Sequence, residues 1–143
     1  MKKYLFGVSP AYFLSKFGDN FTPDNVADSL SELHDLGMNN FQCEIVDKEK
    51  LKLWENGGAV KVSYSAVQNS LNISQFVAHF MLHSFCSKEV LCSDHGLDEM
   101  KQVFTICDIL NFHGQVTVPM GPVDYLPEEK QLTLLCFESQ DLL

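Results

Sequence analysis

Basic residues are scarce in this sequence, which has ten lysine and arginine residues against nineteen acidic residues and a formal net charge of −9. An acidic protein repels phosphate backbones and anionic lipid surfaces, so nucleic-acid binding lacks its usual electrostatic driving force. Long apolar runs are missing as well, because no stretch approaches the roughly 18 to 20 apolar residues of a membrane span. The composition therefore predicts no nucleic-acid partner and no membrane association.

The signature motifs of several enzyme classes are also absent. The sequence has no phosphate-cradling Gly-rich loop, no nucleophile elbow and no zinc motif. Its five cysteines are an odd number without a Cys-x-x-Cys pair, namely Cys43, Cys86, Cys92, Cys107 and Cys136. We therefore expect reduced cysteines and a cytoplasmic location. The amino terminus superficially resembles a signal peptide, but its apolar run breaks at Ser9-Pro10 and no small-residue cleavage site follows.

Four segments have the pattern of β-strands, with starts near residues 4, 41, 75 and 115. The spacings of about 37, 34 and 40 residues leave room for helices between them, which is typical of right-handed crossovers on a parallel sheet. A chain of 143 residues with 45% hydrophobic content predicts one domain over residues 1–143. A closed eightfold barrel takes about 250 residues, so this sequence supplies about half of one.

The third of these strands is expected over 75–85, where aromatic residues cluster and two histidines, His79 and His83, follow an apolar start. Asn72-Ile73-Ser74 is expected to form the turn before it. A buried helix is the alternative for this segment. The fourth strand is expected over 115–119, with 111–114 as the turn into it.

The most clearly marked helix covers 22–37. Thr22 can cap it, Pro23 takes the first helical position, and Asp24 meets the positive end of the helix dipole. The aromatic-rich segment before Thr22 is expected to be a loop. Further helices are expected over 97–110 and from Pro127 onwards.

Between the second and third strands, Asp47 is expected to cap a helix that Gly57-Gly58 interrupts. Helical periodicity then resumes, and its apolar positions predict one buried face, made of Val60, Tyr64, Val67 and Leu71.

Side-chain alternation sorts the strand residues onto two faces. The polar positions fall together on the inner face, whose members are Gly7, Ser9, Gln42, Glu44, Val77, His79 and Thr117. If the parallel strands curl as in a barrel, Ser9, Glu44 and His79 approach one another at the carboxyl ends, where such folds bind their substrates.

The sequence resembles the amino-terminal half of the xylose isomerase-like TIM barrels, the sugar phosphate isomerase/epimerase family. The resemblance is carried in order by five segments, 3–9, 21–23, 41–44, 75–80 and 116–119. It implies an α/β fold, a partial (half) TIM barrel with four parallel strands in the order 1-2-3-4. It further implies a small sugar or sugar phosphate as substrate, and a divalent metal (Mn, Mg or Zn) that polarises the sugar while a carboxylate moves a proton.

In the family, most metal ligands come from later strands that this sequence lacks, so no metal ligand is predicted among these residues. Glu44 matches the family's acid at the end of the second strand, and His79 matches its histidine at the end of the third. The apurinic endonucleases of the superfamily carry a histidine on the fourth strand, whereas 118–121 has none. This departure and the acidic charge argue against a nuclease.

The candidate catalytic residues are therefore Glu44 and His79, and the candidate substrate-binding residues are Ser9, Tyr12 and His83. A hydrogen-bonded Glu44–His79 pair with only a structural role is the alternative. The i, i+4 spacing of His79 and His83 brings ligands together only on a helix. Tyr12 follows the first strand, at the end of the sheet where a substrate wall would stand.

Two functions remain open at this point. The first is a sugar isomerase/epimerase-like protein, truncated and inactive alone because the later-strand metal ligands are absent. The second is a non-catalytic half-barrel module that dimerises or packs on a partner, and exposed sheet edges favour such self-association. A doubly wound α/β domain is a third possibility that strand order distinguishes. A natural half-barrel and a shortened gene product both fit the sequence.

Overall fold

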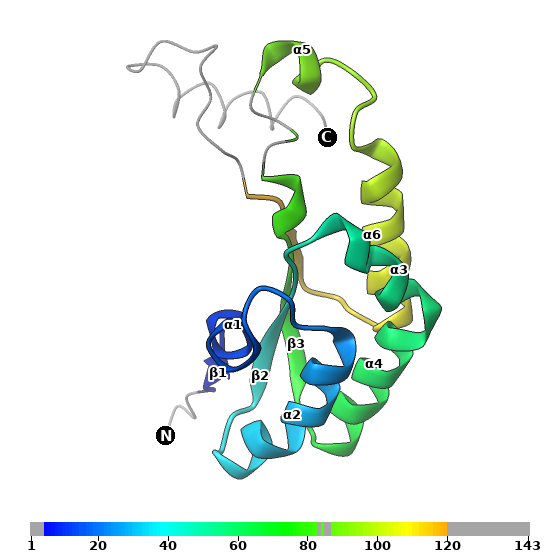
Figure 1. The fold of residues 1–143 in the computed structure, drawn as a ribbon. Helices are drawn as coiled ribbons and strands as arrows, with labels where there is room; N and C mark the ends of the chain where they lie inside the picture. Colours follow the sequence, from blue (N-terminus) through cyan, green and yellow to red (C-terminus); the bar gives the residue numbers. More distant parts are fainter. Residues whose placement is uncertain (1–4, 83, 85–86, 120–143) are drawn as a thin grey trace.

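A parallel β-sheet has the helices α2 (Pro23–Asp35), α4 (Ala59–Gln68) and α6 (Leu97–Ile109) on one side (Figure 1). The computed structural model describes residues 5–82, 84 and 87–119. Its four strands are β1 (Gly7–Val8), β2 (Asn40–Ile45), β3 (Asn72–Ala78) and β4 (Gln115–Thr117), and all neighbours are parallel. Their order is β1-β2-β3-β4, which confirms the α/β half-barrel prediction and excludes a strand-order reversal within this sheet.

The boundaries of β3 differ from the prediction. Asn72-Ile73-Ser74 is not a turn, because Asn72 and Ile73 already pair with Asn40 and Phe41 of β2. The strand also ends early, at Ala78, and a 3-10 turn, η3 (His79–Met81), follows it. His83 and residue 85, at the end of the expected strand, lie outside the described part of the chain.

A register shift inside the β2–β3 pairing sets the orientation of β3. Phe41 pairs with Ile73, but the next residue, Gln42, pairs with Gln75, so Ser74 is an extra residue in β3. The Ser74 hydroxyl donates to the Phe41 carbonyl at 3.2 Å, which satisfies a backbone acceptor beside the irregularity. Because side chains alternate, the extra residue moves Gln75 to the face of Gln42 and Phe76 to the opposite face.

The two outer strands are shorter than predicted. β1 covers Gly7–Val8 and so begins later than the expected start near residue 4, and β4 stops at Thr117 rather than at residue 119. Proline has no backbone N–H for a ladder, which agrees with the early end of β4.

Helix α1 (Ala11–Phe17) replaces the loop expected after β1. Its first turn is closed by backbone bonds from Tyr12 and Leu14 to the carbonyls of Ser9 and Pro10, at 3.1 and 3.0 Å. Phe13 is fully buried and stacks on Phe21, with ring centroids 5.9 Å apart. Burial of this aromatic side chain stabilises a helix that composition alone did not indicate.

Helix α2 (Pro23–Asp35) begins as predicted. The Thr22 hydroxyl accepts from the Asn25 amide, and the Asn25 side chain accepts from the Thr22 amide, so a reciprocal capping box closes the helix start. Asp47 likewise accepts from the Glu49 amide at the start of η1 (Lys48–Lys50), which leads into α3 (Leu51–Leu53).

The expected interruption at Gly57-Gly58 is a kink in η2 (Trp54–Gly58), before α4 (Ala59–Gln68). Gly57 has a φ of 106°, which L side chains rarely adopt. At Gly58 a Cβ would lie 2.6 Å from the Pro23 ring, so the missing side chain lets α4 start close against α2. The remaining helices are α5 (Lys88–Leu91) and α6 (Leu97–Ile109), and the helix expected from Pro127 lies outside the described residues.

The predicted buried face of α4 is wrong for three of its four members. Val60, Tyr64 and Val67 are 59%, 68% and 72% exposed, whereas the buried residues of this helix are Ala59, Val62 and Ala66. α4 carries apolar residues on two faces, and the face with small side chains turns inward because the helix lies close to its neighbours. Leu71 is buried as predicted, but it lies beyond the helix end.

The hydrophobic core lies between the sheet and the helix layer. The outer face of β2 and β3 is almost fully buried, with Phe41, Cys43, Ile45, Phe76 and Ala78 at most 1% exposed. The Trp54 ring packs edge-on against Phe76 at 5.8 Å, so Phe76 points to the helices as predicted. Among the described residues, no helix is both long and apolar enough to cross a bilayer.

The core position of Val62 predicts a contrast between two valines of α4. Val62→Ala removes two buried methyl groups and should lower the free energy of unfolding by roughly 1 to 3 kcal/mol in urea titrations. Val60→Ala should change it by less than about 0.5 kcal/mol, because the Val60 side chain is mostly in water. Equal losses for the two variants would contradict the observed orientation of α4.

The described cysteines differ in their predicted reactivity. Cys43 and Cys107 are buried, and burial raises the pKa of both thiols, that of Cys107 to about 12. Cys92 is exposed. Since the thiolate is the nucleophile, iodoacetamide at pH 8 should alkylate Cys92 in the folded protein and spare Cys43 and Cys107 until urea is added. Site-resolved mass spectrometry measures this, and rapid native labelling of Cys43 would contradict it.

Candidate functional site

Glu44 and His79 meet at the carboxyl ends of β2 and β3. The His79 Nδ1 atom lies 2.8 Å from Glu44 Oε1, although the two residues are 35 positions apart. The Glu44 side chain is 6% exposed, whereas the His79 side chain is 44% exposed. The sheet therefore holds a buried carboxylate beneath a partly accessible imidazole.

Strand geometry explains why these two side chains meet. Glu44 pairs in register with Val77, and Ile45 pairs with Ala78, so His79 follows directly beyond the end of the paired region. Alternation places Glu44 and Val77 on the face opposite Phe76. The predicted convergence of Glu44 and His79 on one side of the sheet is thus present in the structure.

The contact defines what the pair can do chemically. A buried carboxylate needs a hydrogen-bond donor, and His79 Nδ1–H provides one. This bond leaves Nε2 as the ring nitrogen available to a ligand, and in the neutral tautomer with the proton on Nδ1 it is a hydrogen-bond acceptor. This arrangement can orient His79 as a general base. It equally fits a structural role, in which His79 only satisfies the hydrogen-bonding need of the buried Glu44 carboxylate.

A row of polar side chains that had not been singled out as a site crosses the same face. Gln42 Nε2 donates to Gln75 Oε1 at 2.7 Å, and Gln75 Nε2 donates to Thr117 Oγ1. These residues lie on β2, β3 and β4 and are partly buried. Alternation had placed Gln42 and Thr117 on the inner face, and it places Gln75 there too, two residues before Val77.

The hydrogen bonds and ring contacts of the other predicted site residues within the described part of the chain do not include Glu44 or His79. Ser9 is exposed directly after β1, and its carbonyl accepts the Tyr12 amide. The Tyr12 hydroxyl accepts from Lys16 Nζ at 3.3 Å, within α1, and its ring contacts Phe13 edge-on. His83 lies outside the described residues. The described contacts therefore join Glu44 with His79 and connect Ser9 and Tyr12 with α1.

The described residues offer few ligands for the divalent metal that the resemblance implies. Glu44 and His79 provide two donor groups, and His79 Nδ1 is already bound to the carboxylate. Catalytic zinc sites use three protein ligands, and within 5–82, 84 and 87–119 no three His, Cys, Asp or Glu side chains gather for a metal. The described residues alone do not fit a metal site.

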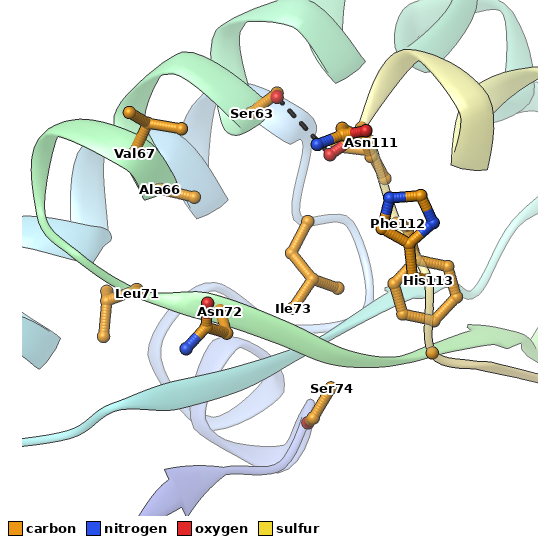
Figure 2. Close-up of a pocket in the computed structure, with 12 residues that line it drawn as sticks. Ser63, Ala66, Val67, Leu71, Asn72, Ile73, Ser74, Asn111, Phe112 and His113 are labelled. Carbon is orange, nitrogen blue, oxygen red and sulfur yellow. Dashed lines mark hydrogen bonds between the residues drawn. The ribbon is translucent and has the colours of Figure 1, made fainter.

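A separate pocket of about 410 Å³ lies toward the amino ends of β3 and β4 (Figure 2). It forms where α4 and α6 end with a residue of positive φ, Ser70 at 53° and Asn111 at 52°. The next residues, Leu71 and Phe112, bond back to the carbonyls of Ala66 and Cys107 in Schellman geometry. Apart from His113, its lining holds no titratable side chain.

Comparison with solved structures gives a fold-level relative. The chain is similar to the crystal structure of a protein from Rhodospirillum rubrum that is provisionally named a xylose isomerase, with a TM-score of 0.55 and 15% sequence identity. The match covers 96% of this chain and 45% of that chain, so this chain spans less than half the length of its structural relative. No protein-family model and no curated protein matches the sequence. The likeness shows a shared fold: parallel strands alternating with helices, as in part of a xylose isomerase-like TIM barrel.

Proposed function

We propose that this chain supplies the Glu44–His79 part of a sugar isomerase/epimerase-type site, with a small sugar or sugar phosphate as substrate. The observation that carries the proposal is the 2.8 Å contact between His79 Nδ1 and Glu44 Oε1. It lies at the carboxyl ends of neighbouring parallel strands, where TIM-barrel enzymes place their active sites. The fold-level likeness to a xylose isomerase-like protein supports the same reading.

The proposed chemistry is proton transfer at a carbon next to the sugar carbonyl. His79 Nε2 takes the proton from that carbon, and the electron pair of the broken C–H bond moves onto the carbonyl to give an enediolate. The proton of the neighbouring sugar hydroxyl passes to the former carbonyl oxygen, and the imidazolium returns its proton to the former carbonyl carbon, which completes an isomerisation. The Glu44 carboxylate keeps the imidazole oriented and stabilises its cationic form, as the acid of a catalytic triad does.

Groups beyond Glu44 and His79 are needed for a complete site. The structural relative is more than twice as long as this chain, and the described residues gather no set of metal ligands. The divalent metal that the resemblance implies would be held by later strands. We therefore propose that the chain alone binds sugars weakly and turns them over little. A cytoplasmic location is also proposed, because Cys43, Cys92 and Cys107 are free thiols.

A second candidate function is a non-catalytic assembly module. In the described sheet, β1 and β4 are the outer strands, and each has one neighbour. Gln42, Gln75 and Thr117 remain partly exposed on the concave face, which is the face of the sheet opposite helices α2, α4 and α6. Unpaired strand edges favour pairing with another chain, so two copies could close one barrel by parallel pairing of β4 with β1 of the second copy.

Sugar binding tests the first candidate. In a titration with D-xylose or D-fructose 6-phosphate, the ring signals of His79 should shift in NMR spectra. His79→Gln should weaken binding about tenfold or more, because a lost hydrogen bond worth about 1.5 kcal/mol corresponds to that ratio.

The matched control for this titration is His34→Gln, since His34 is exposed on α2. That variant should bind as the wild type does. The proposal would be abandoned if neither sugar moved the His79 signals, or if His79→Gln bound both sugars unchanged.

Sedimentation tests the second candidate. Analytical ultracentrifugation over a range of concentrations should show a dimer if two copies close a barrel. Val116→Pro removes a backbone N–H from the edge strand β4 and should shift the equilibrium toward monomer. A monomer at every concentration rules out assembly by this chain alone.

A further inference from the structure

Three residues form one row across the concave face of the sheet. Glu44 of β2 pairs in register with Val77 of β3, and Val77 pairs with Thr117 of β4. Neighbouring strands lie about 4.8 Å apart, so the backbones of Glu44 and Thr117 are separated by roughly 10 Å. Val77 lies between them as a short apolar side chain that is neither fully buried nor fully exposed.

The side-chain hydrogen bonds next to this row all run in one direction across the sheet, with each donor on the strand nearer to β2. Gln42 donates to Gln75, and Gln75 donates to the Thr117 oxygen, so Gln75 and Thr117 each accept from the preceding strand. A hydroxyl has one donor and two acceptor positions. Because the bond with Gln75 uses an acceptor position of Thr117, its O–H remains available as a donor, and no acceptor for it appears among the described hydrogen bonds.

This direction gives the two ends of the row complementary roles. At the β2 end, His79 Nε2 is a proton acceptor beside the Glu44 carboxylate. At the β4 end, Thr117 is a hydroxyl donor, held in place by an amide that is itself held by Gln42. The ladder residues Gln42, Gln75 and Thr117 carry no charge, so this end of the row is suited to a neutral oxygen rather than to a phosphate.

We propose that Thr117 is a specificity-determining residue that donates a hydrogen bond to a neutral sugar oxygen, while the carbon skeleton of the sugar lies over Val77 and another part of it reaches His79. Gln42 and Gln75 are positioning residues that act through Thr117. The inference rests on the proposed function and names the part of the substrate bound here: an uncharged hydroxyl- or carbonyl-bearing segment of the sugar chain.

Titration of Thr117 variants with D-xylose, followed at the His79 ring signals, tests this assignment. Thr117→Val replaces the hydroxyl with a methyl group of similar size and should weaken binding about tenfold, the ratio for one hydrogen bond of about 1.4 kcal/mol. Thr117→Ser keeps the hydroxyl and should bind within about threefold of the wild type. Gln75→Leu leaves Thr117 in place but removes its orienting donor, and should give an intermediate loss.

Thr105→Val is the matched control, because Thr105 is an exposed threonine of α6 whose hydroxyl donates to the Lys101 carbonyl. It should leave sugar binding unchanged. The His79 signals of the free variants should match those of the wild type, which shows that the Glu44–His79 contact persists. If Thr117→Val perturbs the fold, the comparison of Thr117→Ser with Thr117→Ala gives the same contrast.

The outcomes separate this inference from the proposed function. Sugar binding by the wild type that Thr117→Val leaves unchanged would overturn the role of Thr117 and leave the Glu44–His79 proposal intact. Absence of sugar binding by the wild type would overturn both. Equal weakening by Thr117→Val and Thr117→Ser would also count against the inference, since a lost hydroxyl would then not be the cause.

Discussion

The extra residue Ser74 in β3 is the constraint on which the arrangement of both sheet faces depends. Without it, the pairing of Phe41 with Ile73 would continue as Glu44 with Phe76, and a large aromatic ring would lie beside the carboxylate on the concave face. With it, Phe76 enters the core against Trp54, and Val77 lies beside Glu44. The Ser74 hydroxyl bond to Phe41 holds this shift in place, so one serine near the start of the strand orients a site at its end.

The two faces of the sheet are stabilised by different interactions. On the outer face, the apolar side chains of Phe41, Cys43, Ile45, Phe76 and Ala78 are at most 1% exposed, and close packing under the helix layer restricts them. The concave face holds a buried carboxylate, and a buried carboxylate is costly unless a donor lies within hydrogen-bond distance. His79 provides that donor and remains accessible. The contact that offsets the cost of burying the Glu44 carboxylate therefore also orients the imidazole for a ligand.

Local chemistry and alternation made much of this structure predictable from the sequence. Thr22-Pro23 marked the start of α2 through capping, and alternation along 41–46 placed Glu44 opposite the core residues Phe41 and Cys43. The inward face of α4 was not predictable in this way, because apolar residues occur at helical spacing on two sides of that helix. Tertiary proximity, seen where Gly58 lies against Pro23, selected the side with the smaller residues.

The errors at α1 and at the start of β3 have a common physical origin. Asn72-Ile73-Ser74 has turn-like composition, and the aromatic segment after β1 has no long amphipathic period, yet both adopt regular structure through partners far away in the sequence. Ile73 pairs with Phe41, and Phe13 of α1 stacks on Phe21 at the entry to α2. Such contacts outweigh local propensity, which amounts to less than about 1 kcal/mol for most residues. A site built where strands meet is therefore best predicted from pairing register, because one residue of slip exchanges its whole set of side chains.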